Sequence, residues 1–501
     1  MHGLYSVAQI RAIERAAYAG LPAGTLMRRA GLAASHAALA LLAQRAGPVL
    51  VLAGPGNNGG DALEAAAHLA DAGVPTFVIL VNGAERSAEA AQALDRARAG
   101  SARFIDSPAQ APDWVLALDG LFGIGLQRPL DGAARDLVLA VNAAQRPVLA
   151  LDVPSGLDAD SGALIGADGA DGADGLAVVA THTLTFIGDK PGLHTFMGRD
   201  HAGAVTLATL DIAPALLPAP QVRLGEPALF AHCLRPRAHA SHKGSFGDVA
   251  ILGGAQGMLG AALLAARTAL FAGAGRVFVA ALGPVPPVDA MHPEIMLRDA
   301  AGFDSSRATL VAGPGMGIAA PAPQLLAKAI DGTAPLVLDA DALNLIAASG
   351  DLQGRLASRG TPAILTPHPL EAARLLGVTA ALVQQDRLAA AHELAERFNC
   401  IVVLKGSGTL IARRAGTADD ATCVINPTGN PGLASGGTGD VLAGLSGSLL
   451  AQGWPAWEAA LGAVWLHGAA ADRLVAQGIG PIGLTAGELA PALRQLLNER
   501  L

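Results

Sequence analysis

Cysteine is scarce in this sequence, and so are aromatic and charged residues. Only 3 of the 501 residues are cysteine, 3% are aromatic and 15% are charged. The cysteines, Cys233, Cys400 and Cys423, lie far apart and no pair of them has CxxC spacing. This pattern excludes a disulfide framework and a zinc knuckle, and it fits a reducing compartment. We therefore expect a cytoplasmic protein.

The sequence also lacks the features of membrane and nucleic-acid-binding proteins. No window of 18 residues is uninterruptedly apolar, and the first segment, MHGLYSVAQIRAIERAA, carries charges without the apolar core of a signal peptide. The formal net charge is −8, and no basic cluster has interleaved aromatic residues. We expect neither a membrane nor a nucleic acid as partner.

Apolar and small residues are abundant, with 51% hydrophobic residues and 62 glycines. A chain of this length exceeds one ordinary core, so two or three domains are expected. In the first half, short apolar runs alternate with helical patterns, which predicts βαβ units and a parallel sheet covered on both faces. These runs are 49–53, 76–81, 114–118 and 148–151.

Residues 212–240 carry five prolines and no strong periodicity, which makes this segment the best linker candidate. A second α/β series follows, so the sequence predicts two α/β domains of similar size, each with three layers. We assign residues 1–212 to the first domain, 213–229 to the linker and 230–501 to the second. The strands predicted in the second half are 248–252, 276–280, 309–312, 336–339, 363–366 and 401–404.

One acidic residue, Asp440, lies among glycines and precedes an apolar run typical of a buried helix. A glycine loop at a helix N-terminus directs unpaired N–H groups at an anion such as phosphate. A carboxylate at the same place suits phosphoryl transfer, because it would take a proton from the attacking hydroxyl. The alternative is an aspartate that caps the helix after a flexible loop. The neighbouring glycines are Gly429, Gly432, Gly436, Gly437 and Gly439.

In the first half, the segment GPGNNGGD at residues 54–61 follows a predicted strand and matches GxGxxG, the dinucleotide fingerprint. Pro55 and the two asparagines are unusual for that turn, and no GK[ST] follows. Further loops at 119–125, 152–158 and 190–193 fall where parallel strands should end, so these loops should converge. Oxygen donors on Asn58, Asp119 and Ser155 suit a hard cation. Asp152 would remain available as an acid or a base.

Residues 1 to about 212 resemble the YjeF N-terminal family, the NAD(P)H-hydrate epimerases, through LYSVAQIRAIE, GPGNNGGD, DGLFGIG, LDVPSGLDADSG and TFIGDKPGL in this order. The resemblance implies a Rossmann-like fold that interconverts the R and S forms of NADHX and NADPHX, the C6-hydrated nucleotides. It implies K⁺ at Asn58, Asp119 and Ser155, with Asp152 at the reacting centre. The implied substrate-binding residues are Asn57, Asn58, Gly59, Gly60, Asp61, Gly123, Ile124, Gly125, Leu126, Gln127, Arg128, Pro129 and Asp152.

The sequence departs from that family in two places. Ala62 and then Glu64 follow the GGD segment, where the family usually has glycine after GGD, and Arg28 replaces the acid of LMExAG. Ala62 would be costly if its backbone needed a positive φ. The reversed charge of Arg28 would alter a surface or dimer contact.

Three features of the second half suggest a nucleotide site. The Lys405–Thr409 turn follows an apolar strand, so its amides and ammonium group could hold a phosphate, although a surface hairpin is an equal alternative. His368 lies between two prolines and precedes a helix that Glu371 would help to start; a lone histidine is more often structural. Strand alternation places Asp339 and Asp341 on opposite faces, so we expect at most one in the cleft and neither as a metal ligand.

Residues 230 to about 498 resemble the ADP-dependent NAD(P)H-hydrate dehydratases, of ribokinase-like fold, through LTPHPLEAARLL and NPTGNPGLASGGTGDVLAG. The resemblance implies that Asp440 deprotonates the C6 hydroxyl, which accepts the β-phosphoryl group of ADP, and that phosphate then leaves to give NAD(P)H and AMP. It implies Mg²⁺ on the ADP phosphates and a homo-oligomer, a tetramer or larger. The implied substrate residues are Ala261, Gly317, His368 and Asp440, and the implied ADP residues are Lys405, Gly406, Ser407, Gly408, Thr409 and Gly439.

Together the two halves predict a fused nicotinamide-nucleotide repair enzyme, with an isomerase followed by a lyase. The alternative is a small-molecule kinase of the same ribokinase-like fold, whose first half only binds a ligand.

Overall fold

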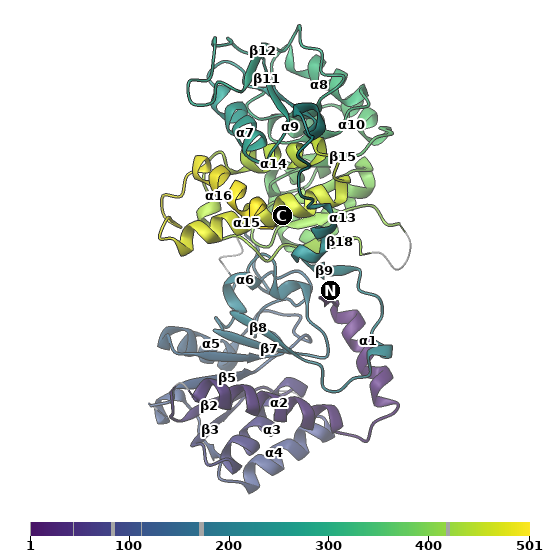
Figure 1. Ribbon diagram of the computed structural model, residues 1–501. Helices are drawn as coiled ribbons and strands as arrows, with labels where there is room; N and C mark the ends of the chain where they lie inside the picture. The colour runs from purple at the N-terminus through teal and green to yellow at the C-terminus, as the bar shows by residue number, and fades with distance from the viewer. Residues whose placement is uncertain are drawn as a thin grey trace. The chain divides into compact units, whose positions relative to one another are not determined.

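The structure is a computed structural model that describes residues 2–43, 45–81, 86–111, 113–169, 175–416 and 421–500. The chain divides into two compact units, His2–Val222 and Arg223–Leu501. Each unit contains a largely parallel sheet with helices packed on it (Figure 1). The predicted class, two layered α/β domains, is confirmed. No helix in the described part of the chain is both long and apolar enough to cross a membrane.

The N-terminal unit is built on a seven-stranded parallel sheet in the order β4-β3-β2-β5-β6-β7-β8. Successive strands extend the sheet from β2 toward one edge, and from β5 toward the other. The carboxyl ends of β2 and β5 therefore flank a topological switch point, where open α/β sheets bind ligands. The strands are β2 (Val49–Ala53), β3 (Thr76–Leu80), β4 (Arg103–Phe104), β5 (Leu116–Gly120), β6 (Val148–Leu151), β7 (His182–Phe186) and β8 (Ala204–Ala208), and a short β1 (Gly3–Leu4) precedes them.

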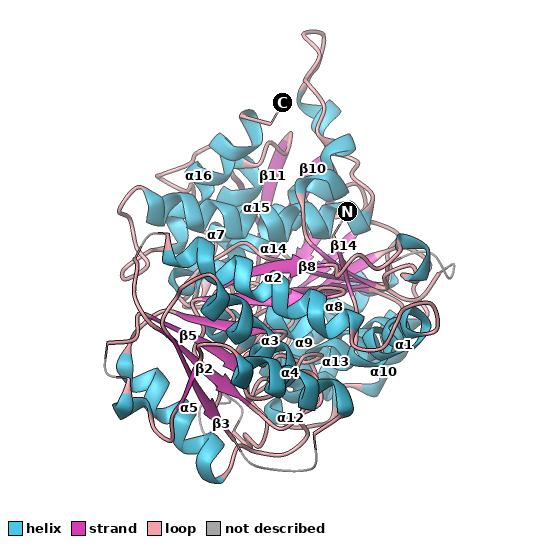
Figure 2. Ribbon diagram, turned by 90° about the horizontal axis from the view of Figure 1, so that it is seen from below, coloured by secondary structure: helices cyan, strands magenta, loops and turns pink. Residues whose placement is uncertain are grey.

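Helices cover both faces of this sheet, as the uninterrupted apolar strands predict. In β2, Val49 and Val51 face a core shared with α2, α3 and α4, whereas Leu50 and Leu52 face a core shared with α5 (Figure 2). The helices are α1 (Val7–Tyr18), α2 (Thr25–Leu42), α3 (Asn57–Asp71), α4 (Ala88–Ala99), α5 (Gly132–Ala144) and α6 (Gly198–His201).

The tight turn from β2 into α3 explains part of the glycine-rich segment. A Cβ on Gly59 would lie 2.0 Å from the carbonyl oxygen of Gly54, so only glycine fits there. This close approach starts α3 at Asn57, directly at the carboxyl end of β2.

The sheet of the C-terminal unit runs β9-β18-β17-β16-β15-β14-β13-β10-β11-β12. Neighbouring strands from β12 to β16 are parallel to one another. The strand β17 is antiparallel to both of its neighbours, β16 and β18. The strands are β9 (Val222–Leu224), β10 (Asp248–Gly253), β11 (Arg276–Ala281), β12 (Met296–Asp299), β13 (Thr309–Ala312), β14 (Leu336–Leu338), β15 (Ala363–Leu365), β16 (Ile401–Leu404), β17 (Leu410–Ala412) and β18 (Cys423–Ile425).

The helix α14 (Thr438–Ala451) is almost entirely buried between this sheet and other helices. It approaches α7 closely, since a Cβ on Gly444 would lie 2.1 Å from the carbonyl oxygen of Ala265. Its N-terminus is thereby fixed near the carboxyl ends of the strands. The other helices are α7 (Leu259–Phe271), α8 (Ala322–Asp331), α9 (Asp341–Ala348), α10 (Gly350–Ala357), α11 (Pro369–Leu376), α12 (Ala380–Gln385), α13 (Arg387–Phe398), α15 (Ala456–Ala476) and α16 (Ala486–Asn498).

Candidate active sites

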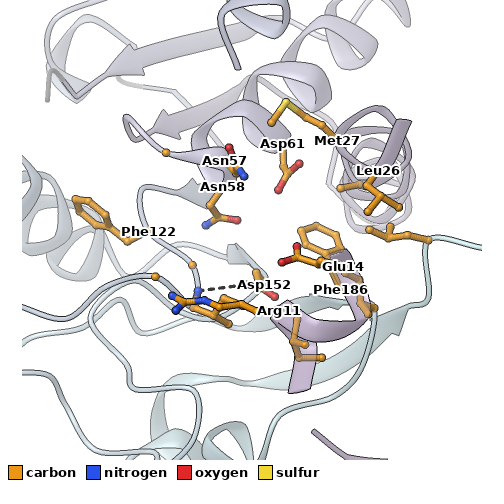
Figure 3. A pocket seen from close by; sticks show the side chains of 18 of the residues that line it. Arg11, Glu14, Leu26, Met27, Asn57, Asn58, Asp61, Phe122, Asp152 and Phe186 are labelled. Carbon is orange, nitrogen blue, oxygen red and sulfur yellow. Dashed lines mark hydrogen bonds between the residues drawn. The ribbon is translucent and has the colours of Figure 1, made fainter. Parts of the chain in front are cut away.

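The N-terminal unit has a cavity of about 390 Å³ at the switch point of its sheet (Figure 3). Its walls come from α1 and α2, from the turn between β2 and α3, from the loop after β5, from the residue after β6 and from the end of β7. The predicted convergence of loops at the strand ends is therefore observed. The predicted residues that line the cavity are Asn57, Asn58, Asp61, Gly123, Ile124, Gly125, Leu126 and Asp152.

The remaining predicted substrate residues lie outside the cavity lining. Gly60 faces Met27, whose methyl carbon would lie 2.6 Å from a Cβ at that position, so this glycine allows helix packing. Gly59 packs against the preceding turn. Gln127, Arg128 and Pro129 lie beyond the part of the loop that reaches the cavity.

Asp152 is held in a strained backbone conformation beside a buried cation. Its φ is +68°, in the left-handed region that costs a non-glycine residue energy. Lys190 Nζ lies 2.5 Å from Asp152 Oδ1 and also donates to Thr185 Oγ1 and to the carbonyl oxygen of Phe186 at 2.7 and 2.9 Å. Lys190 is completely buried. The turn at 190–193 was expected near the site from its place after a strand, but no sequence pattern indicated a role for the lysine itself.

Two more carboxyl groups, Glu14 and Asp61, line the same cavity. Burial raises the pKa of Asp61 well above its usual range, and the negative charges of Asp152 and Glu14 add to the effect. Burial also raises the pKa of Glu14, with Asp152 contributing and Lys190 opposing. Sequence reasoning gave Glu14 no role, although it is the last residue of the segment LYSVAQIRAIE that carries the resemblance.

The three predicted K⁺ residues, Asn58, Asp119 and Ser155, are all buried. Ser155 donates through its amide to Asp119 Oδ2 at 2.8 Å and through its hydroxyl to Asp119 Oδ1 at 2.7 Å. Burial raises the pKa of Asp119 to about 6, although these bonds and one from Leu121 lower it. Asn58 Oδ1 is buried and has no hydrogen-bond partner in the described chain. The buried carboxyl group of Asp119 and the unpartnered amide oxygen of Asn58 both lie at the strand ends. Such oxygen donors fit a hard cation.

The two departures from the epimerase pattern are accommodated. Ala62 is buried in α3 and is not among the residues with positive φ, so the backbone cost considered above does not arise. Glu64 is buried and forms an ion pair with Arg96 of α4. Arg28 is exposed and donates to Thr25 Oγ1 at 3.2 Å.

In the C-terminal unit, charged side chains meet at the carboxyl ends of β14 and β16. Lys405 Nζ lies 2.7 Å from Asp339 Oδ1 and 3.8 Å from Glu371 Oε2. Thr366 donates to Asp339 Oδ1 at 2.8 Å. A Cβ on Gly439 would lie 3.4 Å from Lys405 Nζ, which places the start of α14 beside these groups.

Asp440 stands in the first turn of α14, and the capping alternative for it is wrong. The N-cap is Gly437, with φ +92°, and no side chain caps the helix. Burial, followed by the negative charge of Asp339, raises the pKa of Asp440 to about 7, although Lys405 lowers it. A carboxyl group with a pKa near neutrality is suited to accept a proton.

The expectation that Asp339 and Asp341 face opposite ways is wrong. Positions two apart in a strand share a face, so alternation does not separate these two residues; moreover, β14 ends at Leu338 and Asp341 is already the first residue of α9. Asp341 Oδ2 accepts a hydrogen bond from the amide of Gly317 at 2.8 Å. Both carboxylates raise the pKa of Asp440. The predicted residue Gly317 is thereby tied to the same charge cluster.

His368 caps α11 rather than standing alone. Its Nδ1 accepts from the amide of Leu370 at 3.1 Å, and Glu371 Oε2 accepts from the amide of His368 at 2.8 Å. The expected role of Glu371 in starting this helix is confirmed. Burial raises the pKa of Glu371 to about 7, against the influence of Lys405.

The Lys405–Thr409 segment is the turn between the antiparallel strands β16 and β17, as the hairpin alternative predicted. Gly406 and Gly408 have φ of +139° and +61°. The buried Arg387 donates to the carbonyl oxygens of Leu404 and Lys405 at 3.2 and 3.3 Å. These bonds hold the end of β16, where the turn begins. Within this turn, Lys405 is the residue that joins the charge cluster, through its ion pair with Asp339.

Two positions complete the comparison with the predicted residues. Ala261 is in the first turn of α7, whose Leu264 would contact a Cβ on Gly437 at 2.6 Å. Sequence reasoning missed His467 of α15, which is buried close to Thr438; burial lowers its pKa to about 4. Its Nε2 has no hydrogen-bond partner among the described residues.

Comparisons with known proteins match both halves. Residues 23–192 match a family described as "YjeF-related protein N-terminus", and residues 249–493 match one described as "NAD(P)H-hydrate dehydratase". The chain is 38% identical over 507 residues to the Bifunctional NAD(P)H-hydrate repair enzyme Nnr of Coxiella burnetii, covering 99% of each protein. It is 35% identical over 510 residues to the protein of that name from Escherichia coli, covering 99% of this chain and 94% of the other.

Two further proteins resemble the second half. The ADP-dependent (S)-NAD(P)H-hydrate dehydratase of Neisseria meningitidis is 47% identical over 277 residues, which are 54% of this chain and 91% of that protein. The crystal structure of an ADP/ATP-dependent NAD(P)H-hydrate dehydratase from Bacillus subtilis, co-crystallized with ATP/Mg²⁺, has 30% identity and a TM-score of 0.45. It covers 54% of this chain and 96% of that one.

Proposed function

The chain belongs to the family of bifunctional NAD(P)H-hydrate repair enzymes, and from that premise we propose how its two units divide the chemistry. The N-terminal unit epimerises the R and S forms of NADHX and NADPHX at the cavity that contains Asp152. The C-terminal unit dehydrates the S form with ADP at the charge cluster around Asp440. The observation that carries the second assignment is the carboxyl group of Asp440 in the first turn of α14, whose glycine-rich start lies beside Lys405.

In the dehydratase reaction, Asp440 takes the proton of the C6 hydroxyl, and the hydroxyl oxygen attacks the β-phosphorus of ADP. AMP leaves, and the C6 oxygen now carries phosphate, which is a far better leaving group than hydroxide. Phosphate then departs from C6 while C5 loses a proton, which restores the dihydropyridine ring. The amides at the start of α14 and the ammonium group of Lys405 stabilise charge on the phosphoryl group in transfer.

The charge cluster around Asp440 suits a nucleotide that brings its own metal ion. Asp339 is already bonded to Lys405 and Thr366, and the described residues contain no cluster of three acidic, histidine or cysteine side chains placed to hold a metal. Mg²⁺ would therefore be held mainly by the ADP phosphates, and when bound it would neutralise charge on them. Lys405, Gly406, Ser407, Gly408, Thr409 and Gly439 are the residues we propose to contact ADP.

For the epimerase, we assign Asn58, Asp119 and Ser155 to K⁺, which when bound would offset the buried negative charge of Asp119. The cavity residues, with Asp152 among them, hold the hydrated nicotinamide ring. Supporting this assignment are the buried, unpartnered Asn58 Oδ1 and the burial of Asp119 without a cationic side chain bonded to it in the described chain. The whole protein is proposed to act in the cytoplasm as a homo-oligomer, a tetramer or larger.

The K⁺ assignment predicts a salt-specific and pH-dependent stability. Because a proton and K⁺ compete for Asp119, exchanging KCl for choline chloride should lower the melting temperature of the N-terminal unit above pH 6 and have little effect well below it. Saturating K⁺ should stabilise by about 2 kcal/mol. Thermal melts of wild type, Asp119→Asn and the exposed control Asp136→Asn would measure it. A K⁺ effect that survives in Asp119→Asn contradicts the assignment.

The proposed division of labour predicts that the full chain converts pure R hydrate to NADH only when ADP and Mg²⁺ are present. One AMP and one phosphate should be released for each NADH formed. The near-ultraviolet absorbance measures NADH, and chromatography measures the nucleotides. A stable phosphorylated product would support the kinase alternative. Conversion of the S form alone would show that the N-terminal unit only binds.

A further inference from the structure

Two of the three described carboxyl groups that line the epimerase cavity, those of Asp61 and Asp152, come from separate elements and have opposite electrostatic surroundings. Asp61 extends into the cavity from α3, and Asp152 enters from the end of β6 (Figure 3). Asp152 is bonded to the buried ammonium group of Lys190 at 2.5 Å and accepts from the amide of Ile124 at 3.3 Å. Within the described chain, no ion pair or side-chain hydrogen bond reaches the carboxyl group of Asp61.

The groups that face Asp61 are mainly negative. They comprise Glu14 of α1, Glu89 of α4 and Asp152, and with burial they raise the pKa of Asp61 well above its usual range. Tyr18 of α1 also lines the cavity, and its hydroxyl group is directed to Glu89 at 3.4 Å. Arg11, which lines the cavity, and the buried Lys190 lower the pKa of Glu14 instead.

Such a pair, one carboxyl kept neutral and one ion-paired, is the arrangement that enzymes use for acid and base roles in one site. Resting on the proposed epimerase function, we propose that Asp61 is a second catalytic residue, which protonates the departing C6 hydroxyl group. The C6–O bond breaks and water leaves, while the lone pair of the ring nitrogen forms a C6=N iminium ion.

Water then adds to the other face of C6, and Asp152 accepts the proton that this water loses. The new C6–O bond returns the electron pair to nitrogen, so the product has the inverted configuration and the same composition as the substrate. For the reverse reaction the two carboxyl groups exchange roles, and one proton transfer through solvent resets them. No redox step or further reactant is needed.

The other carboxyl group of the cavity, Glu14, is the natural competitor for the acid role. Lys190, Arg11 and Arg15 all lower its pKa and favour its ionised form, whereas no cation lowers that of Asp61. Asp61 also lies in the cavity on a different element from Asp152, and no ion pair or side-chain hydrogen bond reaches its carboxyl group in the described chain, so we assign the proton donor to Asp61 rather than to Glu14.

The test follows R-to-S conversion of NADHX by the full chain without ADP, so that the dehydratase is silent. Asp61→Asn should lower kcat by about 100-fold or more and change KM by less than about threefold, because it removes only proton donation. Asp61→Glu should retain part of the activity. Asp71→Asn, on the exposed end of the same helix, should match wild type.

Two readouts distinguish a proton donor from a structural residue. Wild-type kcat should fall as pH rises through the raised pKa of Asp61, and this limb should be missing in Asp61→Asn. In water labelled with heavy oxygen, each inversion should introduce one solvent oxygen at C6.

An unchanged kcat and pH profile in Asp61→Asn would overturn the proposal, as would inversion by wild type without solvent oxygen, which would indicate ring opening instead. A larger loss in Glu14→Gln than in Asp61→Asn would transfer the acid role to Glu14. If the wild-type chain does not exchange the two forms at all, the proposed epimerase function fails rather than the role of Asp61. Dehydration of the S form by each variant confirms that the preparation is intact.

Discussion

Asp440→Asn is expected to lower the kcat of dehydration by about 100-fold or more and to leave epimerisation unchanged. Asparagine keeps the size of the side chain but cannot accept the proton of the C6 hydroxyl. The loss should appear in kcat rather than in KM for ADP, since the amides at the start of α14 remain. Glu393→Gln, which changes an exposed acid on α13, is the matched control.

The pH dependence gives a second check on the same group. Because Asp440 must be ionised to act as a base and its pKa is about 7, wild-type kcat should rise with pH through that value. Asp440→Asn should show no such rise. Dehydration at the wild-type rate by this variant would remove Asp440 from its role.

Stability should change in the opposite direction from activity. The folded-state pKa of Asp440 is raised, so its contribution to stability is complete below the ordinary aspartate value and is lost as pH rises through about 7. Above pH 7 the wild type therefore contains a costly buried carboxylate that Asp440→Asn lacks. The variant should melt at a higher temperature than wild type there, and the difference should vanish in acid.

The strands and the location of both sites could be predicted because apolar patterning and loop placement are local properties of the sequence. The runs at 248–252 and 401–404 became β10 and β16 almost unchanged. The strand predicted at 114–118 lies instead at Leu116–Gly120. It extends through Asp119 because hydrogen bonds from Ser155, distant in the sequence, satisfy that buried carboxyl group.

The partners of the functional carboxyl groups could not be predicted, since they depend on tertiary contacts. Lys190 reaches Asp152 across 38 positions, and Lys405 reaches Asp339 across 66. The carboxylate of Asp341, the first residue of α9, accepts from the amide of Gly317, and this contact across 24 positions has no signal in a local pattern. The sequence thus predicted which loops meet. The ion pairs that set the pKa values of the carboxyl groups could be identified only from the folded structure.

Lys405→Met is expected to destabilise the C-terminal unit by about 3 kcal/mol at neutral pH, because it leaves Asp339 buried without its cation. Asp339 is 2% exposed, and Lys405 Nζ is 2.7 Å from it. Although burial opposes the effect, Asp339 and Glu371 raise the pKa of Lys405, so the stabilising charge is fully present at neutral pH and is lost only as pH rises through that raised pKa. Denaturant unfolding of the variant and of the exposed control Lys328→Met measures the difference.

The double variant Lys405→Met/Asp339→Asn separates the charge pair from other effects. With both charges removed, most of the lost stability should return, because the closest buried charge is gone and Glu371, whose pKa is about 7 even beside Lys405, can take up a proton. Stability that stays as low as in Lys405→Met would mean that the lysine stem, rather than its charge, supports the fold.

The same substitution should also shift the pH profile of dehydration. Lys405 lowers the pKa of Asp440, so its removal should move the rise in kcat to a pH above 7, in addition to raising KM for ADP. A lysine that only contacts phosphate would raise KM and leave the pH profile in place. If the pH midpoint of the rise in kcat does not move, Lys405 acts only in nucleotide binding. If it moves, Lys405 also helps to set the pKa of the catalytic base.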